Sequence, residues 1–156
     1  MSDPNLTEAR KRITRITRIT DNRTAGPNHA VLTIEGGKGD LYRRGPCPTC
    51  PWRVDAVGEF PAEAFKHSAP VAYDMATHVF ACHQSGSSKP AICAGFLLRN
   101  SVNNLGVRLK LCRGLIDLNQ VTDGGHELHA SYRDMAVANG VNLHDPVLAS
   151  CRADND

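Results

Sequence analysis

The segment from residue 36 to residue 59 is too rich in glycine and proline to form a long helix or a central strand. The residues responsible are Gly36, Gly37, Gly39, Gly45, Pro46, Pro48, Pro51 and Gly58. A loop of this length needs a cross-link or a bound group to hold it. It contains Cys47 and Cys50, and two further cysteines, Cys82 and Cys93, follow on later elements.

These four cysteines predict a metal site. Two residues separate Cys47 from Cys50, so a single turn can direct both sulfur atoms at one metal ion, and Cys82 and Cys93 complete a closed set of four thiolates. A thioredoxin-like redox pair has the same C-x-x-C spacing, but it belongs to a βαβ unit, which this pattern does not predict. Four ordinary buried thiols are the remaining alternative, and they would not explain an ordered loop.

The metal is predicted less sharply than the site, because both Zn²⁺ and a [4Fe–4S] cluster accept four thiolates. Closed four-thiolate zinc sites commonly stabilise small domains, yet Pro51 stands where zinc knuckles usually have glycine. Widely spaced ligands near Trp52, Phe80 and Phe96 also suit a cluster shielded by apolar side chains. We therefore prefer Zn²⁺ by a small margin and keep the [4Fe–4S] cluster as the alternative.

Three residues beside the cysteines are candidates for supporting roles. His83 follows Cys82, and since adjacent residues on a strand point to opposite faces, we expect it at the surface or hydrogen-bonded to a thiolate rather than as an alternative ligand. Trp52 is expected to pack against the turn. Arg53 has two equal alternatives: an ordinary salt bridge, or pairing with the negative charge of a four-thiolate centre or a phosphate.

The three cysteine motifs together resemble a known family. C-x-x-C-P-W-R at residues 47–53, F-x-C-H at 80–83 and C-x-G-[FW] at 93–96 resemble a family of small bacterial and bacteriophage proteins, the domain of unknown function 6283. The resemblance spans roughly residues 45–140. It implies a small metal- or cluster-binding protein with its ligands at the four cysteines, and it implies no particular activity.

The pattern along the chain predicts a small α+β protein, mainly helical, with a short strand or hairpin region, organised around the four-cysteine site. The β-branched run at residues 30–34 predicts one strand. The Arg-Ile-Thr repeat at residues 12–20 has a period of three, which fits neither a strand nor a helix. We expect a flexible basic arm at residues 1–28, a single metal-stabilised domain at 29–145 and a polar tail at 146–156.

Helices are predicted at residues 62–67, from residue 92 onward, at residues 101–116 and at residues 126–139. Phe65, Ala69, Ala72 and Met75 are expected to face inward. The third helix should bury a stripe of apolar side chains at spacings of three and four residues, namely Val102, Leu105, Leu109, Cys112 and Ile116. On the last helix, His126 and His129 are better explained as surface residues than as a metal chelate, and Cys151 is expected to be free in the tail.

The charge balance says little about partners. Eighteen basic residues against 16 acidic ones give a formal net charge of +2, which is weak for a DNA-binding protein. The side chains best placed for nucleic-acid contact are Arg12, Arg15 and Arg18 in the arm and Arg108, Lys110 and Arg113 on the third helix. We therefore expect a non-enzymatic metal-binding module that binds nucleic acid or, in a phage product, a host regulatory or defence protein.

Two other functions stay open. One is a redox- or oxygen-sensing regulator built on a [4Fe–4S] cluster, and the other is a zinc-dependent enzyme using His83 or Glu59 as proton carrier. No catalytic triad or carboxylate pair is recognisable, so no catalytic residue is predicted. No stretch approaches the roughly 18 consecutive apolar residues of a membrane helix, and the polar, basic first 20 residues lack a secretory signal. We expect a cytoplasmic protein, in the host cytoplasm if it is a phage product.

Overall fold

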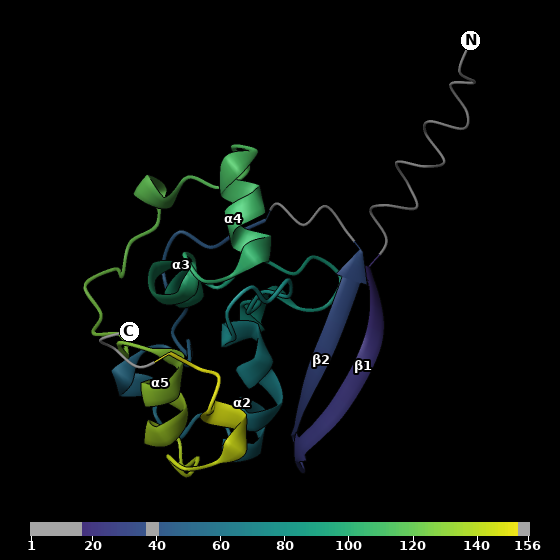
Figure 1. Cartoon of the computed structure of the whole chain (residues 1–156), viewed down its shortest axis with the longest axis vertical. Helices are drawn as coiled ribbons and strands as arrows, with labels where there is room; N and C mark the ends of the chain where they lie inside the picture. Colours follow the sequence, from purple (N-terminus) through teal and green to yellow (C-terminus); the bar gives the residue numbers. More distant parts are fainter. Residues whose placement is uncertain (1–16, 37–40, 153–156) are drawn as a thin grey trace.

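A computed structural model describes residues 17–36 and 41–152 (Figure 1). Within these residues the fold is a small α+β arrangement of one two-stranded antiparallel sheet and four α-helices, joined by loops and short 3-10 turns. The strands are β1 (Thr17–Gly26) and β2 (His29–Gly36), and the helices are α2 (Ala62–Ser68), α3 (Ala94–Asn100), α4 (Leu105–Cys112) and α5 (Tyr132–Ala138). The coarse fold class expected from the sequence is therefore confirmed.

Strand β1 corrects one expectation about the N-terminal arm. The predicted strand at residues 30–34 lies within β2, but residues 17–26 are not a flexible arm, because they pair along β2 from Thr17 opposite Gly36 to Gly26 opposite His29. The register shifts between Ile19 and Asp21 and again between Thr24 and Gly26. These irregularities allow a segment without strict alternation of polar and apolar residues to pair as an antiparallel strand. The three-residue period of the Arg-Ile-Thr repeat therefore did not predict this strand. Residues 1–16 of the arm lie outside the described residues.

The hairpin lies along one side of the helical body, next to α2 (Figure 1). Ala25 is buried there, and a ring nitrogen of His67 on α2 lies 3.2 Å from the carbonyl oxygen of Thr24. Near the other end of the hairpin, His78 Nε2 lies 3.4 Å from a carboxylate oxygen of Glu35. A two-stranded sheet is marginally stable alone, so these contacts with the body support it.

Trp52 occupies the centre of the core and is fully buried. Its ring lies 6.1 Å from Phe80, 6.3 Å from Phe96 and 5.9 Å from Tyr132, measured between ring centroids. The cysteine turn therefore ends directly beside the main aromatic cluster. With aromatic residues so scarce in this chain, this cluster gathers much of the aromatic surface available for burial.

Gly95 makes the close approach of α3 to Trp52 possible. A Cβ atom at this position would lie 2.4 Å from Trp52 Cβ, which is inside any normal contact distance. The glycine between Cys93 and Phe96 is therefore required by packing, because it lets the start of α3 lie against the tryptophan that follows the C-x-x-C turn.

Helix α2 begins after Pro61 as predicted, and Phe65, Ala69 and Ala72 are buried. Met75, expected to face inward, has 54% of its surface exposed. Its backbone adopts a left-handed conformation with φ of 63°, which turns the chain away from the helical direction after Ala72. The inward face of this segment therefore ends earlier than the spacing of apolar residues predicts.

The helix predicted at residues 101–116 is shorter and rotated. Helix α4 starts only after Asn104, whose side-chain oxygen accepts a hydrogen bond of 2.9 Å from the Val107 N–H. The same side chain is fully buried and donates to the carbonyl oxygens of Val71 and His78. These bonds fix the register of α4, so Val107 faces the core. The expected stripe is wrong for its exposed members Val102, Leu109 and Cys112.

The last helix also begins later than predicted, at Tyr132 after the capping residue Ser131. Residues 126–129 are not helical, because the backbone of this segment pairs with the cysteine turn: Val54 N–H donates to Glu127 O, and His129 N–H donates to Trp52 O. The predicted end at Asn139 and Gly140 is confirmed, with Gly140 at φ of 101°.

The C-terminal segment, expected as a frayed polar tail, packs into the core as far as the structure describes it, and Cys151 is a free thiol as predicted. Leu148 and Cys151 are 1% and 2% exposed. Cys151 forms a β-bridge with Tyr73, and the Arg133 guanidinium donates to the carbonyl oxygens of both Leu148 and Cys151. Burial raises the pKa of the Cys151 thiol to about 11. Residues 153–156 lie outside the described residues.

Candidate functional site

The four cysteines of the three motifs lie on two segments of the chain, and local backbone hydrogen bonds fix the conformation of each segment. Cys47 and Cys50 lie at the ends of one turn, closed by a 3.0 Å hydrogen bond from Cys50 N–H to Cys47 O. Cys82 N–H donates to Ala91 O at 2.7 Å, and Cys93 N–H donates to Phe80 O at 2.9 Å. This antiparallel pairing brings Cys82 and Cys93 to the two sides of one loop, and Cys93 directly precedes α3.

The structure brings one pair of these thiols into direct contact. Cys50 Sγ and Cys93 Sγ lie 3.6 Å apart, and both residues are buried. Cys47 is half-buried, and its pKa is raised by burial and by the nearby thiols of Cys82 and Cys50. Cys47 and Cys82 therefore lie in the neighbourhood of the buried pair.

Ionisation differs between the members of the buried pair. The pKa of Cys50 is lowered to about 7, mainly by a hydrogen bond with the Cys93 thiol; burial opposes this, and the Trp52 and Arg53 N–H groups and the Arg53 charge contribute to the lowering. The pKa of Cys93 is raised well above its ordinary value by the same hydrogen bond and by burial. The two shifts therefore favour ionisation of Cys50 over ionisation of Cys93.

Backbone N–H groups surround three of the four sulfurs. Besides the two donors at Cys50, the Thr49 N–H lowers the pKa of Cys47, although burial and the neighbouring thiols raise it overall. At Cys93, the N–H groups of Phe96 and Gly95 act in the same direction. Donors of this kind stabilise thiolates, which are the form of cysteine that binds metals. The chemistry of the donor set fits a metal ion or cluster.

A ready-made metal site is nevertheless not present. Across residues 17–36 and 41–152, no group of three or more histidine, cysteine, aspartate or glutamate side chains is arranged so that it could hold a metal ion. All six cysteines are free thiols. The structure brings two of the predicted ligands, Cys50 and Cys93, into contact, and the four-cysteine metal site stays a prediction.

The residues expected to support the site have distinct positions. Trp52 packs in the core, and its Nε1 is buried with no hydrogen-bond partner in the described structure. Arg53 forms a two-pronged ion pair with Asp55, at 2.8 and 2.6 Å, and its third nitrogen donates to Cys47 O at 3.4 Å. It therefore combines the salt bridge with a place beside the thiols. His83 is exposed and stacks edge-on against Phe60 at 5.0 Å.

The basic residues proposed for nucleic-acid contact do not form one described surface. Arg12 and Arg15 lie outside the described residues. Arg18 on β1 pairs with Glu35 at 3.7 Å. On α4 and just after it, Arg108 and Arg113 are exposed and Lys110 is half-buried. The Arg108 guanidinium lies 3.7 Å from the Met75 sulfur.

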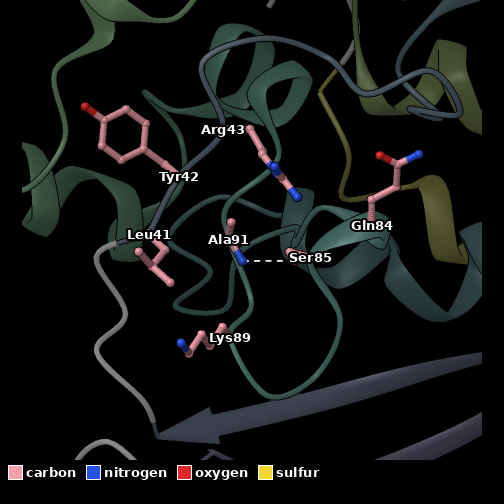
Figure 2. A pocket seen from close by; sticks show the side chains of 7 residues that line it. All are labelled: Leu41, Tyr42, Arg43, Gln84, Ser85, Lys89 and Ala91. Atoms are coloured by element: carbon pink, nitrogen blue, oxygen red, sulfur yellow. Dashed lines mark hydrogen bonds between the residues drawn. The ribbon is translucent and has the colours of Figure 1, made fainter.

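Sequence reasoning missed two other cations, Arg43 and Lys89, which line a hollow beside the cysteine loops (Figure 2). Arg43 lies just before the C-x-x-C turn, and Lys89 lies in the loop between Cys82 and Cys93. No motif joins them, so only the pairing of residues 41–43 with Ile92 reveals that they line the same hollow.

Fold and site together define a small α+β protein with a cysteine-rich centre built on loops. The chain belongs to DUF6283, a family of unknown function whose sequence pattern matches residues 42–152. The match includes all three cysteine motifs and extends past the region of resemblance expected from them. Searches of curated proteins and of solved structures found no match. None of the helices in the described part of the chain is long and apolar enough to span a membrane.

Proposed function

We propose that the protein is a metal-binding regulatory or interaction module whose four thiols, Cys47, Cys50, Cys82 and Cys93, hold one Zn²⁺ ion. The observation that supports this most directly is the 3.6 Å separation of Cys50 Sγ and Cys93 Sγ. Two thiolates at about 2.3 Å from a tetrahedral zinc ion lie about 3.8 Å apart. The buried pair already has nearly this spacing, so the Cys47–Cys82 pair needs only to close on the same centre.

The ion would supply a cross-link between two loop segments that have little regular structure of their own. One segment is the C-x-x-C turn, and the other is the loop between Cys82 and Cys93. The N–H groups of Trp52, Arg53 and Gly95 orient and stabilise the thiolates. Four thiolates around Zn²⁺ have a net charge of −2, and the nearby Arg53 guanidinium offsets part of it.

The same spacing is the reason to prefer zinc over a [4Fe–4S] cluster. Each thiolate of such a cluster binds a different iron atom, so its cysteine sulfurs stand farther apart than ligands that share one ion. One observation favours the cluster as a second candidate, with redox or oxygen sensing as its function. The aromatic rings of Trp52, Phe80 and Phe96 pack beside the cysteine loops and would shield a cluster from solvent.

Elemental analysis and an absorption spectrum of anaerobically purified protein test the proposal. We expect a colourless protein with about one zinc ion per chain. The Cys93→Ser variant should lose the zinc, and the Cys112→Ser variant should retain it, because Cys112 is exposed on α4. A brown protein with about four irons per chain would show that the bound group is the [4Fe–4S] cluster and not zinc. Metal-free protein with all thiols titratable would refute both.

The proposed partner is nucleic acid or, if the protein is of phage origin, a host regulatory protein. The exposed Arg108 and Arg113 support a phosphate-contacting surface, whereas Arg18 is partly neutralised by Glu35. Measuring the binding of a fluorescent DNA duplex at several salt concentrations distinguishes a nucleic-acid partner from a protein partner. Affinity for nucleic acid should fall steeply with salt and fall less steeply for an Arg108→Gln/Arg113→Gln variant. Absence of DNA binding at low salt would favour the protein partner.

A further inference from the structure

A hollow of about 340 Å³ opens beside the cysteine loops, between residues 41–43 and the loop at residues 84–91 (Figure 2). Its lining residues are Leu41, Tyr42, Arg43, Gln84, Ser85, Lys89 and Ala91. The volume is at the lower end of the range for small-molecule sites. None of these side chains is acidic, so the hollow combines two cations with uncharged polar and apolar groups.

The two cations in this hollow are not neutralised within the described part of the chain. Neither Arg43 nor Lys89 takes part in any of its ion pairs, in contrast to Arg18, Arg23 and Arg53. The Nε atom of Arg43 is buried and has no hydrogen-bond partner among the described residues. An anion in the hollow would therefore contact the terminal nitrogens of the Arg43 guanidinium and the Lys89 ammonium group, which line it, rather than this Nε atom.

The backbone around the hollow is held in place before any ligand binds. Arg43 N–H donates to Ile92 O, and Ile92 N–H donates to Leu41 O, both at 2.9 Å. On the opposite side, Ser85 Oγ donates to Cys82 O at 2.7 Å and accepts from Ala91 N–H at 3.0 Å, the contact drawn in Figure 2. Preorganised walls reduce the entropy lost on binding.

We infer that this hollow binds the phosphate group of a small phosphorylated metabolite of about mononucleotide size. The Arg43 guanidinium offers a planar fork of donors that matches phosphate oxygens, and Lys89 adds a second positive charge. Leu41 and Ala91 provide apolar surface for the rest of the ligand. The inference rests on these contacts alone and does not depend on the metal, although the hollow shares its loop with Cys82 and Cys93.

Isothermal titration calorimetry of the full chain with AMP and, separately, inorganic phosphate tests this site. We expect AMP to bind, and Arg43→Gln or Lys89→Gln to weaken binding by about tenfold or more, since each removes a charge-assisted contact. Arg44→Gln is the matched control: Arg44 is exposed, lies over the Tyr42 ring at 5.9 Å and does not line the hollow. Thermal melting of each variant should stay at the wild-type temperature, which shows that folding is intact.

Three results would overturn the inference. The first is the absence of binding of both AMP and phosphate to the wild-type protein. The second is an equal loss of affinity in Arg44→Gln, which would show attraction to general positive charge. The third comes from a titration with a single-stranded oligonucleotide: if it alone bound, the phosphate would belong to a nucleic-acid backbone and not to a small metabolite.

Discussion

Cys50 Sγ and Cys93 Sγ lie 3.6 Å apart, although 43 residues separate the two cysteines in the chain. The distance is well above the roughly 2.05 Å of a disulfide, so the pair is a dithiol. The hydrogen bond between them lowers the pKa of Cys50 to about 7 and, together with burial, raises the pKa of Cys93, an effect that the Phe96 and Gly95 N–H groups only partly oppose. The packed core thus holds two thiols in contact, and the pKa shifts favour ionisation of Cys50 over Cys93.

Loss of one ligand should destabilise the whole protein, because in a small metal-dependent domain the binding energy of the ion is part of the folding energy. We expect Cys93→Ser to lower the melting temperature of the metal-loaded protein by about 10 °C. Differential scanning calorimetry measures this. Cys112→Ser should melt within about 2 °C of wild type, as an exposed substitution does. Equal melting temperatures of the two variants would contradict a structural role for the metal site.

Gly95→Ala should destabilise the fold by about 2 kcal/mol through overpacking. The added methyl group would meet Trp52 Cβ at 2.4 Å, and the fully buried tryptophan has no room to move. Urea denaturation followed by tryptophan fluorescence gives the free energy of unfolding. Gly45→Ala is the control, since its Cβ would meet only Thr122 O at 4.0 Å. A Gly95→Ala variant as stable as Gly45→Ala would contradict the packing described for α3.

Tyr132→Phe should cost about 1.5 kcal/mol of unfolding free energy. The Tyr132 hydroxyl is buried and lies 2.6 Å from both Phe65 O and Ser68 Oγ, which ties α5 to α2. Chemical denaturation measures the loss. Tyr42→Phe serves for comparison, because its hydroxyl accepts only one long hydrogen bond of 3.4 Å from Asp117 N–H. The idea fails if the two substitutions cost the same.

His129 should make the protein less stable in mild acid. Burial lowers the pKa of its imidazole below the ordinary 6.5, an effect only partly opposed by Asp134 and Glu127. The unfolded chain therefore takes up a proton first as the pH falls through 6.5, and the free energy of unfolding decreases from there until the folded-state pKa is passed. Urea denaturation at pH 7.5 and 5.5 should show this decrease.

A matched pair of variants isolates this contribution from the other titrating groups. His129→Gln should reduce the difference in stability between the two pH values, because the group that takes up the proton is gone. His144→Gln, at an exposed position, should leave the difference as in wild type. An unchanged difference in His129→Gln would assign the acid sensitivity to another residue.

Local signals in the sequence predicted several elements correctly. Pro61 marks the start of α2, Gly140 marks the end of α5, and the β-branched run at residues 30–34 lies in β2. Each depends on backbone preferences of a few neighbouring residues, which act before the chain is folded. The sequence also predicted that Cys47, Cys50, Cys82 and Cys93 converge on one metal ion; the structure brings Cys50 and Cys93 to 3.6 Å, and the metal site stays a prediction.

What the sequence determined by itself was therefore local: where chain direction changes, and which thiols are candidates to meet. Tertiary structure decided which faces are buried. Cys112 was expected inside and Cys151 in a polar tail, yet Cys112 is exposed and Cys151, a free thiol as predicted, is buried beside Tyr73. The buried Asn104 set the register of α4 through hydrogen bonds to Val71 and His78. Such partners are distant in sequence, and burial free energy depends on which surfaces meet, so periodicity within one segment could not predict them.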